Sequence, residues 1–284
     1  MCYLLIGNIS AFISDDCTEP LVNARLRVYL PDGRCPTGND PKNYIYNGPG
    51  QLTSAQVEAK QERLLAETTL DERGNFTLTW EQLHLFTEPL ELDISLHHMP
   101  EQAGIRGIVS NYHLSTVVPH WTRSGQRYVA AYAYVIPVEC WSQIRANYGT
   151  WIIAGTVRRL QASEGQSQLR VEAYNVGNHR LLGCARTDDQ GKYQLRFSKK
   201  ELTSKWSTVS EPGHENGPDI YFKVYRDKQL VWEEDPATAM MPGRRSVAPC
   251  TTININIRES AFRKTPGWLG SWAVTGRKSS LVRH

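Results

Sequence analysis

A fifteen-residue segment occurs twice in the chain, and this internal repeat constrains the fold more than any other feature. Residues 64–78 align without a gap with residues 181–195, which lie 117 positions further on. Five pairs are identical: Leu64/Leu181, Leu65/Leu182, Asp71/Asp188, Gly74/Gly191 and Leu78/Leu195. A sequence that repeats at a fixed distance indicates a structural unit that is built twice. We therefore expect two related domains in tandem.

Each copy of the repeat contains the pattern Asp-x-x-Gly between two apolar stretches. An aspartate at the start of a turn accepts hydrogen bonds from the turn backbone, and a glycine supplies the positive φ that the reversal requires. The pattern therefore predicts a hairpin turn in each copy. Its structural residues are Asp71 and Gly74 in the first copy and Asp188 and Gly191 in the second.

The segments around the repeat alternate between apolar and polar residues. Ile253, Ile255 and Ile257, for example, alternate with Asn254 and Asn256. A period of two is typical of a strand with one buried face, and several such strands separated by turns indicate a β-sandwich. Only short helices are expected, one starting at Thr53, where Thr53 and Gln56 suit a capping box, and one over about residues 199–205.

The predicted fold class is all-β, with two tandem antiparallel β-sandwiches of about seven strands each. The first sandwich spans residues 1–147 and carries an insertion over 31–62, the second spans 148–262, and a basic tail that contains tryptophan covers 263–284. The insertion is inferred because Val28 and Leu64 are separated by many more residues than Val171 and Leu181.

The second copy resembles a transthyretin-like domain, also described as carboxypeptidase regulatory-like. The resemblance is carried by Leu182-Gly183-x-Ala185-x-Thr187-Asp188-x-x-Gly191-x-Tyr193-x-Leu195, followed by Gly217-Pro218-Asp219-Ile220-Tyr221-Phe222-Lys223-Val224. It covers residues 153–258 well and the first copy more loosely, mainly over 64–78. The resemblance implies a seven-stranded sandwich that serves as an accessory or structural module rather than a particular chemistry.

Charge is distributed unevenly along the chain. Residues 1–150 carry a net charge of −5 and residues 151–284 a net charge of +8, with five basic and no acidic residues in the last 22 positions. This asymmetry suits head-to-tail attraction between protein copies. A nucleic-acid partner is not expected, because no motif for one is present. No apolar stretch is long enough for a membrane-spanning helix.

The start of the chain and its cysteines favour synthesis in the cytoplasm. No basic residue precedes Arg25, so the first residues are interpreted as a strand and not as a signal peptide. The six cysteines lie far apart in sequence and form no CxxC pair, so free thiols are expected.

No catalytic motif is found, and the chain is predicted not to be an enzyme and to need no cofactor or metal. The chain ends Ser280-Leu281-Val282-Arg283-His284, which differs from the Tyr-Arg-Gly-Ser end of 5-hydroxyisourate hydrolases on a related fold. His113 and His120 are the histidines that a metal could use, but they lack the spacing typical of ligands.

Two segments are predicted to bind protein partners. The insertion is rich in turn residues and contains Tyr44 and Tyr46, and long structured loops on sandwiches often carry binding. In the tail, the predicted contact residues are Trp268, Leu269, Trp272 and Val274, because solvated disordered tails seldom contain two tryptophans. Docking onto the chain's own sandwich and docking onto a neighbouring subunit, for example by adding a strand to a sheet edge, both remain open.

Three hypotheses follow for the function. The first is a non-enzymatic structural or assembly protein, whose sandwiches are rigid docking modules in a multi-subunit complex such as a phage-tail-like contractile injection particle. The second is an accessory module that binds a small molecule or glycan through exposed aromatic residues, for which the candidates are Trp121, Tyr132, Tyr134 and Trp232. The third is a metalloenzyme that uses His113, His120 or tyrosines.

Overall fold

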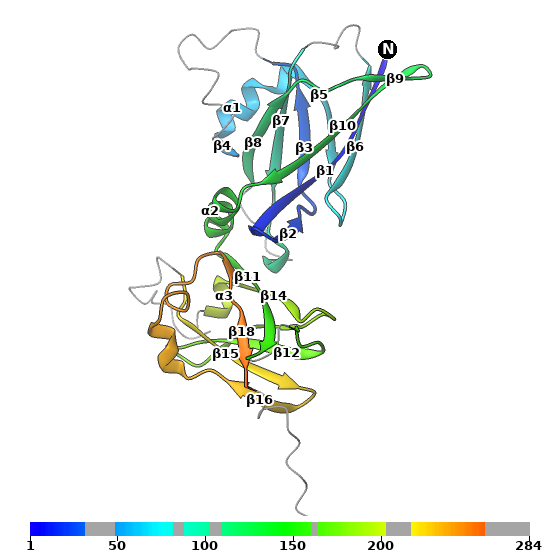
Figure 1. The fold of residues 1–284 in the computed structure, drawn as a ribbon. Coiled ribbons are helices and arrows are strands. Elements are labelled where there is room, and N and C mark those ends of the chain that lie inside the picture. The colour runs from blue at the N-terminus through cyan, green and yellow to red at the C-terminus, as the bar shows by residue number, and fades with distance from the viewer. Residues whose placement is uncertain (32–48, 82–87, 103–108, 161–163, 203–216, 259–284) are drawn as a thin grey trace, which may run out of the picture.

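Two β-sandwiches stacked end to end make up the computed structural model, and a short helix lies between them (Figure 1). The structure describes residues 1–31, 49–81, 88–102, 109–160, 164–202 and 217–258. Most of the described secondary structure consists of strands. The prediction of an all-β fold with tandem sandwiches is confirmed.

The first sandwich consists of two sheets. Its strands are β1 (Cys2–Ser14), β2 (Cys17–Pro20), β3 (Arg25–Tyr29), β4 (Gly50–Leu52), β5 (Leu64–Thr69), β6 (Asn75–Glu81), β7 (Leu90–Leu96), β8 (Ser110–Val117), β9 (Thr122–Ser124) and β10 (Arg127–Ile136). One sheet has the order β2-β1-β10-β9, with β6 also paired to β1, and the other has the order β4-β8-β7-β3-β5.

The second sandwich repeats this arrangement with fewer strands. Its strands are β11 (Thr150–Arg159), β12 (Leu169–Asn175), β13 (Leu181–Arg186), β14 (Lys192–Ser198), β15 (Ile220–Arg226), β16 (Gln229–Glu233), β17 (Cys250–Thr252) and β18 (Ile255–Ile257). One sheet has the order β14-β11-β17, with β18 also paired to β11, and the other has the order β13-β12-β15-β16. The strands of the sequence repeat, β5–β6 and β13–β14, occupy equivalent places in the two sandwiches.

Each sandwich also contains parallel strand pairing that the sequence did not predict. The first strand pairs in parallel with the last: β1 with β10 in one sandwich, and β11 with β17 and β18 in the other. The remaining pairs between strands are antiparallel. Sequence alternation is the same for both directions, so only the chain path reveals the parallel pair.

The helices are short. They are α1 (Ser54–Ala59), α2 (Val138–Tyr148) and α3 (Lys199–Leu202), with the 3-10 turns η2 (Gln61–Arg63), η3 (Pro100–Gln102) and η5 (Pro236–Met240). The predicted capping box at Thr53 is confirmed, because its hydroxyl accepts from the backbone N–H of Gln56 and the Gln56 side chain accepts from the Thr53 N–H. The α2 helix was not predicted, although Gly149 ends it in the left-handed conformation that favours glycine.

The two Asp-x-x-Gly turns have the same hydrogen bonds. The Asp71 carboxylate accepts the backbone N–H groups of Arg73 and Asn75 at 2.8 and 2.7 Å. Asp188 accepts the corresponding groups two and four residues further on, at 2.9 and 2.8 Å. Gly74 and Gly191 both have a φ of 76°. The turn residues are therefore held by the same physical interactions in both sandwiches.

Titration of Asp71 gives a direct test of its turn. The pKa of Asp71 is lowered from 3.8, chiefly because its carboxylate accepts the Asn75 N–H and further because it accepts the Arg73 N–H. A lowered folded-state pKa contributes stability above the unfolded value, and this contribution is lost as pH falls through the folded-state pKa. We expect a carbon-detected NMR titration to place the Asp71 midpoint below 3.8. Asp71→Asn keeps an acceptor oxygen and should lose less stability in acid, whereas a midpoint above 3.8 would contradict the turn geometry.

Candidate functional site at the junction of the two sandwiches

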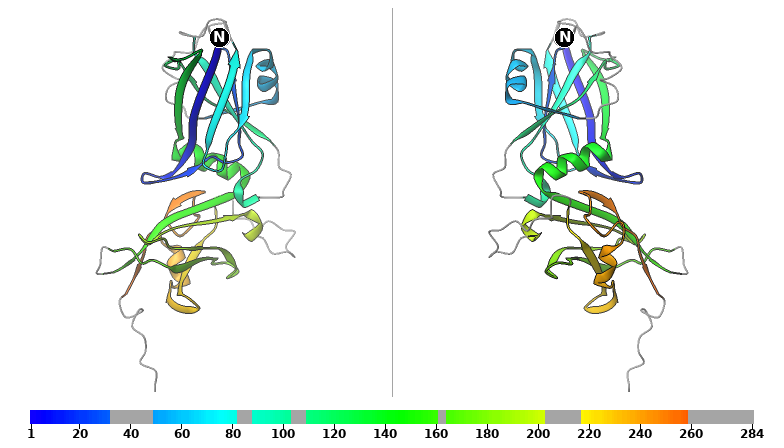
Figure 2. Two further views of the ribbon diagram at one scale, coloured as in Figure 1. Left: turned by 90° about the vertical axis from the view of Figure 1, so that its right-hand side faces the viewer. Right: turned by 90° about the vertical axis from the view of Figure 1, so that its left-hand side faces the viewer.

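The apolar core of the first sandwich continues across the junction into the second. Trp141 and Ile144 of α2 lie within this core, and they are joined there by Ile152, Ala154 and Cys250 of the second sandwich. The helix lies between the two sandwiches (Figures 1 and 2). A linker that contributes buried side chains to a shared core restricts motion, because bending would expose apolar area to water.

One arginine and two glutamates are buried together beside this core, and a second, partly exposed arginine joins them. The Arg145 side chain is fully buried, and its Nη2 lies 2.8 Å from Oε1 of Glu19 and 3.2 Å from Oε1 of Glu101. Arg196, on β14 of the second sandwich, lies 2.9 Å from the other Glu19 oxygen. Trp141 donates its indole N–H to Glu19 as well. The network thus joins β2, η3, α2 and β14, which come from both sandwiches.

The charges in this network balance each other. Burial alone would lower the pKa of Arg145, but the Glu19 and Glu101 carboxylates outweigh this effect and raise the pKa above its ordinary value. A buried ion network adds little stability compared with apolar packing, but it is directional and costly to leave incomplete. We therefore infer that the apolar core holds the two sandwiches together. The Arg145 network then selects one relative orientation of the two sandwiches.

Backbone contacts reinforce the same junction. The backbone N–H of Lys199 donates to the carbonyl of Gly149 at 2.8 Å, which links β14–α3 to the end of α2. The Tyr148 hydroxyl donates to the Leu96 carbonyl at 2.7 Å, and the Gln102 side chain donates to the Tyr148 carbonyl. The C-terminal end of the helix linker is therefore held by both sandwiches.

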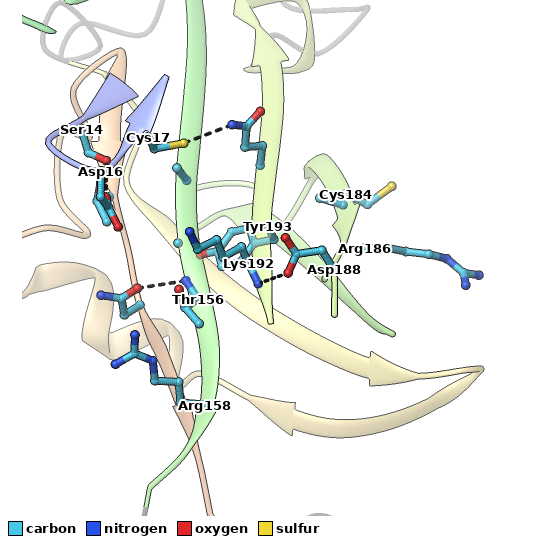
Figure 3. Close-up of a pocket in the computed structure, with 16 residues that line it drawn as sticks. Ser14, Asp16, Cys17, Thr156, Arg158, Cys184, Arg186, Asp188, Lys192 and Tyr193 are labelled. Carbon is cyan, nitrogen blue, oxygen red and sulfur yellow. Dashed lines mark hydrogen bonds between the residues drawn. The ribbon is translucent and has the colours of Figure 1, made fainter. Parts of the chain in front are cut away.

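A polar hollow of about 610 Å³ opens beside the junction. It lies between the β1–β2 hairpin of the first sandwich and the outer face of the β14-β11-β17 sheet of the second (Figure 3). The Gln194 side chain donates to Sγ of Cys17 across this boundary at 3.2 Å. The basic side chains of Arg158 and Lys192 also line the hollow, which has the polarity of a surface groove and not of an apolar cofactor pocket.

A second charged cluster holds the described part of the insertion against the first sandwich. Lys60 follows α1 and lies 2.9 Å from Oδ2 of the buried Asp93 and 2.9 Å from Oε2 of Glu91. His113 contacts the other Asp93 oxygen at 2.8 Å. Burial alone would lower the pKa of Lys60, but the hydrogen bond and charge of Asp93, with Glu91, raise it. Lys60 is therefore a firmly charged anchor and not a lysine that is activated as a base or nucleophile.

Removal of the Lys60 anchor should loosen the insertion. Lys60→Met leaves Asp93 buried, with His113 as the side-chain partner that remains among the described residues. We expect a loss of about 2 kcal/mol in the free energy of unfolding. Limited proteolysis should cut residues 49–63 faster than in the parent chain. Lys228→Met removes an exposed lysine and serves as the control. Equal proteolysis of both variants would show that the anchor does not hold the insertion.

Several predicted residues lie outside this site. Tyr44, Tyr46, Trp268, Leu269, Trp272 and Val274 fall outside the described residues, and their contacts stay predictions. The aromatic residues proposed for glycan binding are half-buried, so the expectation that they are exposed is wrong. Trp121 packs edge-on against Tyr3, with ring centroids 5.0 Å apart, and the hydroxyls of Tyr132 and Ser115 share a hydrogen bond.

The described residues contain no cluster of three His, Cys, Asp or Glu side chains that could hold a metal ion. His113 is paired with Asp93 and lies on β8, whereas His120 is exposed beyond the strand. None of the helices in the described part of the chain has the length and hydrophobicity to cross a membrane.

Sequence reasoning missed the junction network. Arg145, Glu19 and Glu101 lie far apart in sequence, and nothing in the neighbourhoods of Glu19 and Glu101 marks these two residues as buried. One signal was available: Trp141, Ile144, Arg145 and Tyr148 recur at helical spacing between Pro137 and Gly149, which is the pattern of a helix with one buried face.

Comparison with known proteins gives no family for the chain. No family model matches it, and no curated protein is significantly similar to it in sequence. Among solved structures, the shaft pilin SpaA from Lactobacillus rhamnosus GG has 9% identity and a TM-score of 0.28, over 91% of this chain and 98% of that one. The minor pilin from Streptococcus agalactiae has 9% identity and a TM-score of 0.26, over 90% and 94%.

A partial likeness is to a 9R-lipoxygenase from Cyanothece, with 12% identity and a TM-score of 0.26 over 49% of this chain and 17% of the other. With TM-scores below 0.3, these likenesses say nothing about what this chain binds or does.

Proposed function

We propose that the chain is a non-enzymatic structural subunit of a multi-subunit assembly, in which the two sandwiches form one rigid spacer and docking module. The observation that supports this most is the junction, where a shared apolar core and the buried Arg145 network hold the sandwiches in one orientation. A flexible adaptor does not need two sandwiches in one fixed orientation, whereas a subunit that sets a distance between neighbours does.

Two narrower proposals accompany this one. Both sandwiches are proposed to be transthyretin-like, which their shared strand order and the Asp-x-x-Gly hairpin support. The assembly is proposed to be a particle built in the cytoplasm, of the phage-tail-like contractile injection kind. Imaging tests the second proposal, because a sheathed tube would support it, and another regular architecture would remove it while leaving the structural role.

The native mass of the protein tests the proposed function. We would extract the protein from its source cells under mild conditions, measure its mass by light scattering and image it by negative stain. A regular assembly that contains the chain as a stoichiometric subunit is expected. A chain that is monomeric in the extract and again when purified at high concentration would contradict a structural role.

The hollow beside the junction supports a second candidate, which is binding of a small anionic ligand. The basic residues Arg158, Arg186 and Lys192 outnumber the acidic residues Asp16 and Asp188 in its lining. Neither Arg158 nor Lys192 forms a salt bridge within the described residues. Glucuronate and citrate should then raise the melting temperature, and Arg158→Ala should abolish the effect. No shift with either probe at millimolar concentration would exclude this candidate.

A further inference from the structure

Among the described residues, one edge of the β10 strand has no neighbouring strand beyond Val129. In the described part of the chain, β10 pairs with β1 along its whole length, but β9 covers its other side only at Arg127–Val129. Residues 130–136 therefore have no ladder partner on that side within the described residues. Figure 2 shows β10 beside β1 on the first sandwich. A free strand edge is a template for another strand.

The geometry identifies which residues of β10 face this edge. Ser124 and Arg127 flank the two-residue Gly125–Gln126 turn, so they form a hydrogen-bonded pair. Because backbone groups alternate in direction along a strand, the odd-numbered residues of β10 direct their N–H and C=O groups toward β9. The carbonyl oxygen of Tyr132 lies against Gly7 of β1, as expected if even-numbered residues face β1. Ala131, Ala133 and Val135 thus present their backbone groups to the free edge.

The surface beside this edge suits an apolar strand. Ala131, Ala133 and Val135 are exposed, and the first two carry small side chains that allow close approach. On the other face, the rings of Tyr132 and Tyr134 stack with centroids 6.2 Å apart and are half-buried. An added strand would cover both the small side chains and the tyrosine rings.

The tail of the chain has the matching pattern and charge. Trp268, Trp272 and Val274 fall on one face of an extended strand, and Leu269 and Ala273 fall on the other. The five basic residues after position 262 complement the net charge of −5 on residues 1–150. We propose that the tail of a second copy adds a strand to the free β10 edge at Ala131–Val135. This inference rests on the proposed assembly function and names the partner and the surface.

The position of the tail favours a second copy over the same copy. The last described residue, Arg258, follows β18, which pairs with Val157–Arg159 at the end of β11 that lies away from the junction. Thr150, at the other end of β11, is about 30 Å away. The nine residues before Trp268 span at most about 30 Å, so they would need to be fully extended to reach the β10 side of the same chain. A head-to-tail contact between copies needs no such extension and propagates into rings or filaments.

Complementation between two full-length variants tests the proposal. Ala133→Pro removes the backbone N–H that faces the free edge and leaves the hydrogen bonds between β10 and β1 in place. It should prevent the β10 edge from accepting a tail, and Ala133→Ser is the matched control. The double substitution Trp268→Ser, Trp272→Ser should prevent the tail from adding a strand to the β10 edge. Light scattering should show self-association of the parent chain and of Ala133→Ser. The edge variant Ala133→Pro and the tail variant should each self-associate at least tenfold more weakly when measured alone.

A mixture of the edge variant and the tail variant should then form a 1:1 dimer of about 64 kDa, twice the chain mass of 32.2 kDa. In this dimer, the intact tail of the edge variant binds the intact edge of the tail variant. Parent-like association of Ala133→Pro with a normal circular dichroism spectrum would overturn this docking site. The same holds if the mixture remains monomeric, which is the result for a tail that docks on its own chain. If the native assembly forms while these tests fail, the structural role stands and only the β10 contact is wrong.

Discussion

Replacement of Arg145 by methionine should cost about 3–5 kcal/mol of the free energy of unfolding, because it leaves two buried carboxylates without their main partner. Arg145 contacts Glu19 at 2.8 Å and Glu101 at 3.2 Å, and both acids are nearly fully buried. The remaining cation, Arg196, is 31% exposed and lies 3.8 Å from Glu101, so it compensates only in part. Urea unfolding at neutral pH measures the effect.

Controls separate the network from ordinary packing. Arg123→Met removes an exposed arginine and should change stability by less than about 0.5 kcal/mol. The triple variant Arg145→Met, Glu19→Gln, Glu101→Gln removes all three buried charges and should recover most of the loss, because neutral side chains avoid the unpaired-charge penalty. If Arg145→Met costs no more than the Arg123 control, the network does not act as a buried unit.

Replacement of Gly155 by alanine should destabilise the second sandwich by about 3 kcal/mol. A Cβ at this position would lie 1.8 Å from the backbone oxygen of Ile253 and 3.0 Å from the ring of Tyr193. The oxygen belongs to the backbone of the parallel edge, so relief requires β11 and the β17–β18 segment to separate. Hydrogen exchange should therefore accelerate first in residues 250–257.

Two glycines frame this experiment. Gly7 occupies the equivalent place in the first sandwich, where a Cβ would lie 1.8 Å from the Tyr132 oxygen and 2.8 Å from the Phe76 ring, so Gly7→Ala should cause a similar loss there. Gly177→Ala is the control, since its nearest atom is 3.6 Å away. Equal stability of the Gly155 and Gly177 variants would show that close approach at Gly155 is not required.

The glycine pairs explain why the sequence repeat predicted so much of the fold. Gly7 with Phe76, and Gly155 with Tyr193, form one recurring contact in which an aromatic ring after the Asp-x-x-Gly turn covers a glycine of the first strand. The glycines, the aromatic residues and the turn residues are required by local geometry, so they recur at the same places in the sequence of each copy. The half-buried strands did the same through their alternation.

The junction left no such pattern, because it depends on contacts between distant segments. Glu19 and Arg145 are 126 residues apart. The sequence also does not distinguish a buried charged residue from an exposed one. The parallel pairing of β1 with β10 was hidden for a similar reason, since alternation does not reveal strand direction. The candidate site therefore emerged from tertiary structure, whereas the sandwiches emerged from local sequence.

Residual dipolar couplings of the full chain test most directly whether the two sandwiches behave as one rigid unit. Couplings measured on the backbone amides of both sandwiches should fit a single alignment tensor in the relative orientation that α2 and the Arg145 network impose. The Arg145→Met variant should still fold each sandwich but fit a single tensor less well. Two tensors of different magnitude in the parent chain would mean independent motion of the sandwiches, and this would contradict a rigid structural subunit.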